Sequence, residues 1–183
     1  VDKFPEPVLK VGEVVGNISA EAAEIFGLSK KTVVVEGTAD CNACMFGVGG
    51  VRPNGMTLIG GTSTCLLGLS EEEFHVDGVN GTYPNCMYDG TSLLEGGQTA
   101  AGSILTWFKN NLLPAAWMQE AVNRNMNIYD LITEKASAVP IGCDGLVMMD
   151  YFQGNRAPYA DSKARGMFWG LSIGTTPAHL ARA

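Results

Sequence analysis

Thr32-Val33-Val34-Val35-Glu36-Gly37-Thr38-Ala39-Asp40 is the stretch that decides the fold. Its first five residues are rich in β-branched side chains, which is typical of a buried strand. Gly37 to Ala39 then form a short turn, and residues 41–48 have a composition that favours a helix. The stretch therefore predicts a strand, a tight turn and a helix, with Asp40 at or beside the helix N-cap.

Hydrophobic periodicity and turn residues predict the elements on either side of this unit. Ser19 and Gly27 have the residue types that cap the two ends of a short helix. Helices are expected over 20–26, 99–112, 114–124, 128–138 and from 177 onward, and strands over 55–61, 64–69, 146–149 and 167–173. Because helices alternate with strands and hairpins interrupt the pattern, we expect an α/β fold with a mixed sheet.

The composition excludes several classes of protein. The chain has 183 residues, of which 46% are hydrophobic and 17% charged, and this balance is globular rather than disordered. The formal net charge of −7 argues against binding to nucleic acid or to an anionic membrane, since both favour clustered Lys and Arg. No window approaches about 18 consecutive apolar residues, so no membrane span is expected.

The five cysteines are too scattered to indicate a disulfide framework. Cys41 and Cys44 form a CxxC, but no second pair and no nearby His completes a metal site. We expect both to be small buried residues on a helix, and we expect no metal ligands from the protein. A reducing, cytoplasmic compartment fits this cysteine usage best.

Both ends of the chain resemble internal segments of a longer protein. Phe4-Pro5-Glu6-Pro7 has the composition of a linker. Thr176 and Pro177 have the residue types of a helix start, and only about two turns follow them. We therefore expect a piece of a larger chain.

Asp40 is the first candidate functional residue, because ligand sites in α/β sheets gather at the carboxyl ends of strands. A carboxylate there can accept a proton from a substrate hydroxyl as the hydroxyl attacks phosphorus. Spacing alone favours a purely structural role for Asp40, as the cap of its helix.

Two further segments are rich in small residues. Gly60-Gly61-Thr62-Ser63-Thr64 offers backbone N–H groups and hydroxyls that can surround phosphate oxygens, although it lacks the Lys of a Walker loop. An ordinary hairpin turn explains this segment equally well. In residues 95–103, glycines lead into a helix with small side chains in its first turns. A flat ligand could press on that face, but spacing alone favours the packing of a helix on a sheet.

Five separated motifs resemble those of the FGGY carbohydrate kinases, and are most similar to the pentulose kinase (ribulokinase-like) branch. In order, they are Val34–Asp40, Gly61–Cys65, Glu95–Gly102, Gly154–Pro158, and Gly166–Leu171 followed, after seven intervening residues, by His179-Leu180. The resemblance covers nearly the whole chain.

The resemblance implies a partial actin-like ATPase (ribonuclease H-like) fold. Residues 1–50 would be the end of the first domain with the catalytic loop, and residues 55–183 the truncated first part of the second. The family's N-terminal phosphate turn, most of its sugar contacts and its C-terminal adenine-binding segment have no counterpart in these residues.

The resemblance also implies site residues and cofactors. Asp40 would be the base that activates the sugar hydroxyl, and Gly61, Thr62 and Ser63 would contact the phosphates of ATP, which family members use with Mg²⁺. Gly102 and Thr106 match positions that touch the nucleotide, although some members carry Gln in place of Thr106. The implied partners are a sugar and ATP, and the apolar surface of a partial fold predicts a homo-oligomer.

The resulting expectation is a carbohydrate kinase whose chain, taken alone, lacks half of each binding site and is inactive. The main alternative is a non-catalytic actin-like module that binds a nucleotide or a partner. Asp40 argues against that alternative, because a binding module does not need the carboxylate. A stand-alone small α/β binding domain is the third possibility, against which the linker-like start argues.

Overall fold

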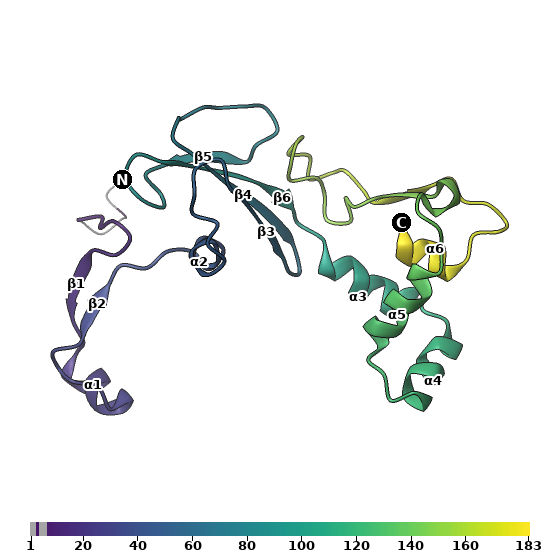
Figure 1. Ribbon diagram of the computed structural model, residues 1–183, viewed down its shortest axis with the longest axis horizontal. Coiled ribbons are helices and arrows are strands. Elements are labelled where there is room, and N and C mark those ends of the chain that lie inside the picture. Colours follow the sequence, from purple (N-terminus) through teal and green to yellow (C-terminus); the bar gives the residue numbers. More distant parts are fainter. Residues whose placement is uncertain (1–2, 4–6) are drawn as a thin grey trace. The chain divides into compact units, whose positions relative to one another are not determined.

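The computed structural model describes residue 3 and residues 7–183, which form two compact units (Figure 1). The first unit comprises the chain up to Thr57 together with Leu66–Val76 and Gly81–Glu95. The second comprises Leu58–Cys65, Asp77–Asn80 and Gly96–Ala183. Helices and strands occur in both, so the α/β class expected from the sequence is confirmed.

Figure 1 labels the helices and the strands β1 to β6. The helices are α1 (Ala20–Phe26), α2 (Asp40–Gly47), α3 (Gly102–Asn111), α4 (Ala115–Asn123), α5 (Ile128–Ser137) and α6 (Pro177–Arg182), with a 3₁₀ turn at Cys143–Gly145. The strands are β1 (Val14–Asn17), β2 (Val33–Val35), β3 (Met56–Gly60), β4 (Thr64–Ser70), β5 (Gly81–Pro84), β6 (Ser92–Gln98), β7 (Val147–Met149) and β8 (Met167–Trp169). No described helix is long and apolar enough to cross a membrane.

The strands form three small sheets. β1 pairs with β2, β7 pairs with β8, and four strands lie in the order β3-β4-β6-β5. β1–β2, β5–β6 and β7–β8 are antiparallel pairs, with Gly81 opposite Glu95 and Val147 opposite Trp169.

The caps of α1 confirm the sequence expectation. The Ser19 hydroxyl accepts a hydrogen bond from the Ala22 N–H at 3.1 Å, which satisfies one of the unpaired donors at the helix start. Gly27 ends the helix in the left-handed conformation (φ 66°), which a residue without Cβ adopts at little cost. The sequence therefore fixes this helix locally at both ends.

The expectation that β2 is buried is wrong. Val33, Val34 and Val35 are 55%, 43% and 52% exposed, because β2 belongs to a sheet of only two strands. Cys44, which the sequence indicated as a buried residue, is also exposed. Both residue types are apolar, so the sequence pattern could not indicate that these positions face solvent.

The core of the second unit is formed mainly by its helices. Ile104 and Phe108 are buried on α3, and Leu131, Ile132 and Ala136 are buried on α5, at the helical spacing that faces one side inward. A smaller cluster of Val139, Cys143 and Leu146 packs against Phe168 of β8 and against Ala178 and Leu180 of α6. α3 thus buries one of its faces in this unit, and its start is part of the candidate site.

β6 is a strand that the sequence did not predict. The sequence indicates that Gly96 and Gly97 lead directly into a helix, but both lie within the strand. A Cβ on Gly97 would meet the Thr64 carbonyl oxygen of β4, so the missing side chain permits the close approach of the two strands. β5 is likewise absent from the elements that the sequence predicts.

The start of α6 is confirmed in detail. Thr176 is the N-cap and Pro177 the first helical residue. His179 completes the cap, because its Nδ1 accepts the Thr176 backbone N–H at 3.2 Å. Its Nε2 lies 3.1 Å from Asp144 Oδ2 in the 3₁₀ turn, which links the helix to the preceding segment.

Candidate functional site

Asp40 lies at the junction between β2 and α2, in the first unit. Ala39 occupies the N-cap and makes no side-chain hydrogen bond, while Asp40 is the first residue of the helix. Asp40 Oδ1 accepts a hydrogen bond from the Cys41 N–H at 2.7 Å. The side chain is exposed, and within the described residues its other oxygen, Oδ2, has no hydrogen-bond partner. The carboxylate therefore stabilises the helix start through one oxygen and leaves the other available.

Two buried side chains anchor α2 beneath Asp40. Met45 is fully buried and Asn42 is 8% exposed. Asn42 Nδ2 lies 3.2 Å from Thr38 Oγ1 and 3.5 Å from Cys86 Sγ. The turn before the helix, the first helical turn and the segment after β5 are thus joined through one amide. Burial raises the pKa of the Cys86 thiol above its ordinary value, so the sulfur remains protonated at neutral pH.

The turn Gly61-Thr62-Ser63 connects β3 to β4 in the second unit. The Gly61 N–H donates to the Ser63 carbonyl oxygen at 2.9 Å, which closes the turn. All three residues are exposed. Within the described residues, the hydroxyls of Thr62 and Ser63 and their backbone N–H groups have no protein partner. These donors are the ones that the turn can offer to an anion.

The carbonyl oxygens of this turn bind the start of α3. The Gly61 oxygen accepts the Gly102 N–H at 2.9 Å, and the Thr62 oxygen accepts the Ala101 N–H at 2.9 Å and the Ser103 N–H at 3.3 Å. The Ser103 hydroxyl also donates to the Thr62 oxygen, at 3.1 Å. Since the first N–H groups of α3 are occupied by the turn, an anion would bind to the turn and not to the helix N-terminus.

Gly102 is required by this contact. A Cβ at position 102 would lie 2.6 Å from the Gly61 carbonyl oxygen, which is closer than non-bonded atoms approach each other. Glycine therefore allows the helix to begin directly against the turn. The structure thus gives one physical reason for the small residue in the motif around 95–103.

Thr106 lies one turn further along α3 and is exposed. Its hydroxyl is 3.4 Å from the Gly102 carbonyl oxygen and 3.3 Å from the Tyr129 hydroxyl of α5. Lys109 Nζ lies over the Tyr129 ring, 5.4 Å from its centre. The hydrogen bond with Thr106 and the nearby Lys109 charge hold the pKa of Tyr129 below its ordinary value. Sequence reasoning missed Tyr129, because nothing local indicates that α5 places it beside α3.

The Gly154–Pro158 motif is held by the end of β6. Gln98 Nε2 donates to the Ala157 carbonyl oxygen at 2.5 Å, and Gln98 Oε1 accepts the Arg156 N–H at 3.4 Å. Asn155 is buried and accepts the Tyr159 N–H through its Oδ1 at 2.7 Å. Because these polar groups bond to one another, the motif serves here to fix a loop on the strand.

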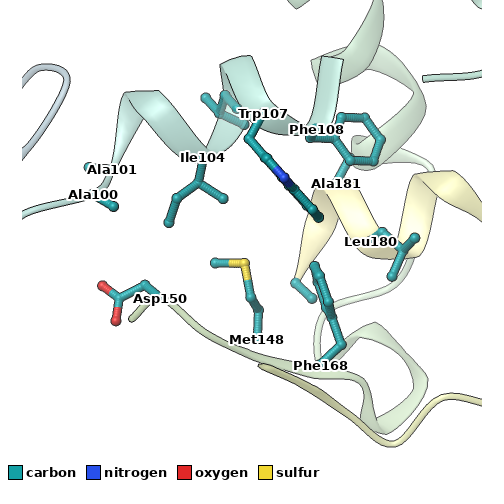
Figure 2. A pocket seen from close by; sticks show the side chains of 12 residues that line it. Ala100, Ala101, Ile104, Trp107, Phe108, Met148, Asp150, Phe168, Leu180 and Ala181 are labelled. Carbon is teal, nitrogen blue, oxygen red and sulfur yellow. The ribbon is translucent and has the colours of Figure 1, made fainter. Parts of the chain in front are cut away.

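An apolar pocket lies beneath α3 (Figure 2). Ile104, Trp107 and Phe108 come from α3 and face Met148 of β7 and Phe168 of β8, with Asp150 at one side. None of the candidate residues Gly61, Thr62, Ser63, Gly102 and Thr106 lines this pocket. With its apolar lining and a single carboxylate, it does not suit phosphate groups.

The structure therefore brings five of the six candidate residues into one unit. Gly61, Thr62 and Ser63 are bonded to the start of α3, where Gly102 lies, and Thr106 follows on the same helix. Asp40 belongs to the other unit. Among the described residues, no three or more His, Cys, Asp or Glu side chains are grouped to hold a metal ion.

Comparison with known proteins identifies relatives over the whole chain. Residues 56–183 match the model of the FGGY family of carbohydrate kinases, C-terminal domain. The chain is 35% identical over 182 residues to a ribulokinase of Staphylococcus aureus (strain Mu3 / ATCC 700698), covering 100% of the chain and 33% of that protein. The chain thus spans about a third of the length of the curated relatives that it matches.

Solved structures agree on the fold. The xylulose kinase from Rhodospirillum rubrum is 30% identical and superposes with a TM-score of 0.76, covering 98% of this chain and 35% of the other. The Plasmodium falciparum glycerol kinase with ADP superposes with a TM-score of 0.66 over 94% of this chain and 32% of the other. At 19% identity the latter supports the fold alone.

Proposed function

Because the chain belongs to the FGGY family of carbohydrate kinases, we propose that it forms part of an enzyme that transfers the γ-phosphoryl group of ATP to a sugar hydroxyl. The ribulokinase and xylulose kinase relatives favour a pentulose as the acceptor. The observation that carries the proposal is the Gly61–Ser63 turn, whose carbonyl oxygens bind α3 while its hydroxyls and two N–H groups stay available.

The turn and α3 are proposed to hold the nucleotide. The backbone N–H groups of Thr62 and Ser63 and both hydroxyls would donate to phosphate oxygens, and such bonds to a charged acceptor are strong. Gly102 and Thr106 would contact the nucleotide beside them. Mg²⁺ would be held mainly by the phosphates, where it neutralises the charge that develops during transfer.

Asp40 is proposed as the base. Its free Oδ2 would accept the proton of the attacking hydroxyl, while its Oδ1 remains bonded to the Cys41 N–H. A carboxylate fixed through one oxygen at a helix start is well suited to this role, because phosphoryl transfer relies mainly on alignment and charge.

The wider organisation follows from the same proposal. Residues 1–50 would end the first of two actin-like domains, and residues 55–183 would begin the second. Among the described residues, no cysteine forms a disulfide bond, which supports a cytoplasmic enzyme. A homo-oligomer would cover part of the exposed apolar surface of the first unit.

Asp40→Asn tests the proposal in the protein expressed from its complete open reading frame. The amide oxygen can keep the bond to the Cys41 N–H, so the helix start is preserved while the base is lost. We expect kcat with ribulose, xylulose or glycerol to fall by about 10²–10⁴-fold. ATP affinity and melting temperature should stay close to those of the unmodified protein.

The opposite result would assign Asp40 a structural role. If Asp40→Ala lowers the melting temperature yet turns over sugar at a near wild-type rate, the carboxylate only caps α2. If the unmodified protein binds ATP but phosphorylates none of the sugars offered, the actin-like binding module becomes the better description.

A further inference from the structure

Asn42 is a buried polar residue that the proposed reaction does not use directly. It is 8% exposed and lies in the first turn of α2. Its Nδ2 lies 3.2 Å from Thr38 Oγ1 and 3.5 Å from Cys86 Sγ, and its Oδ1 lies 3.5 Å from Cys41 Sγ. A buried amide is costly when its hydrogen bonds are lost, so these contacts define where the side chain can lie.

Helix geometry relates Asn42 to Asp40. The two residues are two positions apart, which turns them by about 200° around the helix axis. Their side chains therefore leave α2 on opposite sides, and Asp40 is exposed while Asn42 is buried. Fixing Asn42 fixes the rotation of the first turn, and hence the direction in which Asp40 leaves the helix.

The bond to Thr38 spans the N-cap. Thr38 precedes Ala39, which makes no side-chain bond of its own. The Asn42 amide therefore provides the side-chain link from the first turn of α2 back to the Gly37–Ala39 turn. Without the Asn42–Thr38 hydrogen bond, fewer contacts would fix the conformation of the Gly37–Ala39 turn that leads into Asp40.

The contact with Cys86 extends the link to a second segment. Cys86 lies between β5 and β6, 44 residues along the chain from Asn42. Burial raises the pKa of its thiol. The amide thus connects the first turn of α2 to the β5–β6 connection.

We propose that Asn42 is a positioning residue that fixes the place of the Asp40 carboxylate for phosphoryl transfer. The inference rests on the proposed role of Asp40 as base. A displacement of about 1 Å at a reacting group can cost about 10²-fold in rate, even when the substituted residue touches no substrate. The amide therefore affects the chemical step more than it affects nucleotide binding.

Asn42→Leu tests this in the protein expressed from its complete open reading frame, because Leu has a similar shape and makes no hydrogen bond. We expect kcat to fall roughly 10-fold or more, within the range for a misplaced group, with KM for ATP unchanged. Thr38→Val removes the acceptor of the same bond and should lower kcat in the same way. Thr38→Ser keeps the hydroxyl and should restore most of the activity. The double variant Asn42→Leu/Thr38→Val should lose little more than either single variant, because both remove one bond.

Thr91→Val is the matched control. Thr91 is 5% exposed in the first unit, and its hydroxyl donates to the Tyr88 carbonyl oxygen at 2.8 Å. The variant loses a buried hydrogen bond within the β5–β6 connection and leaves the Asn42–Thr38 bond in place, so it should lower the melting temperature and leave kcat unchanged. If Thr91→Val lowers kcat as much as Asn42→Leu does, Asn42 acts through stability alone and the inference is wrong.

The remaining outcomes separate this inference from the proposed function. If Asp40→Asn is inactive while Asn42→Leu and Thr38→Val keep the wild-type kcat, the positioning role is overturned and the base remains. If Asp40→Asn is active, the proposed function itself fails. Should Asn42→Leu not fold, Thr38→Val decides alone, since it removes the same bond at a half-buried position.

Discussion

The Gly61–Ser63 turn binds the start of α3 and is proposed to bind phosphate. A substitution at Thr62 can separate these two roles. The carbonyl oxygen of Thr62 binds α3, whereas its hydroxyl has no partner in the described structure. Thr62→Ala should therefore leave the fold intact, with a stability change within about 0.5 kcal/mol. The loss of a bond to phosphate should raise the KM for ATP about 10-fold, with a smaller loss in kcat.

Steady-state kinetics and a thermal melt measure both effects. Thr133→Ala is the control, because Thr133 is an exposed threonine on α5 whose hydroxyl donates to the Tyr129 carbonyl oxygen. It should leave the KM for ATP unchanged. A normal KM in Thr62→Ala would remove Thr62 from the proposed phosphate site.

The lack of room for a side chain at Gly102 leads to a further prediction. In Gly102→Ala the new Cβ would meet the Gly61 carbonyl oxygen at 2.6 Å, so either the turn or the helix start must move. We expect a loss of about 1–3 kcal/mol in stability and weaker ATP binding, because overpacking and displacement of the turn occur together. Calorimetry of unfolding and nucleotide titration test the pair of effects.

Gly47→Ala is the contrasting change. Gly47 is also helical, but a Cβ there meets nothing within 4 Å. It should stabilise the protein by about 0.5–1 kcal/mol, as expected for Ala in place of Gly in a helix. If Gly102→Ala behaves like Gly47→Ala, the contact between the turn and α3 is looser than described.

Sequence reasoning at the level of residues found the Asp40 junction and the small-residue turn, because each is encoded within a few neighbouring positions. It missed Asn42 and Tyr129. Their bonds reach Cys86 and Thr106, which lie 44 and 23 residues away along the chain. Such contacts depend on how elements pack, and a single sequence does not give that information directly.

At the scale of elements, the α4–α5 pair carries an ion-pair network that should make stability depend on pH. Arg124 contacts Glu120 of α4 at 3.0 Å and Glu134 of α5 at 2.7 Å, and Lys135 contacts Glu120 at 2.8 Å. The bond to Arg124 lowers the pKa of Glu134, and the bonds to Lys135 and Arg124 lower the pKa of Glu120.

The lowered pKa values of Glu134 and Glu120 determine how stability changes with pH. A carboxyl group with a lowered pKa in the folded state stabilises the fold above its ordinary value of 4.5. That stabilisation is lost as the pH falls below 4.5 through the lowered value. We expect the melting temperature to fall over this range, and to fall less in Arg124→Gln. Equal pH dependence in both proteins would show that the network contributes nothing measurable.

The sequence predicts a helix or strand best when the residues that determine it, such as caps and regularly spaced apolar residues, lie within the segment itself. α1, α4, α5 and the start of α6 occur close to their expected positions, because caps and apolar spacing lie inside each segment. β6 was missed since Gly96 and Gly97 resemble a turn in isolation. Only the neighbouring strand β4 shows why glycine is needed there. The exposure of β2 was missed for the same reason, because burial depends on what else covers the strand.

At the scale of the whole molecule, the chain spans about a third of the length of its curated relatives, so it should not phosphorylate a sugar by itself. Coupled assays of ADP release with ribulose, xylulose and glycerol should give rates at background for the isolated chain. Turnover well above background from the pure chain would show that residues 1–183 contain a complete site.

The isolated chain should also associate with itself. Val33, Val34 and Val35 are exposed in a two-stranded sheet, and such contiguous apolar surface promotes contacts between copies. Light scattering over a range of concentrations should report oligomers or aggregates. A monomer at all concentrations with a cooperative melt would contradict this prediction.

The Gly61–Ser63 turn takes its backbone shape from hydrogen bonds between carbonyl oxygens and the start of α3. Side chains at positions 62 and 63 take no part in that scaffold. A combinatorial library at these two positions would therefore vary the side chains of the proposed phosphate site without changing the backbone of the turn. Such a library could be screened for the use of new phosphoryl donors. Directed evolution towards a different nucleotide or towards polyphosphate has a natural starting point in this turn, where most variants should remain folded and can be selected on chemistry alone.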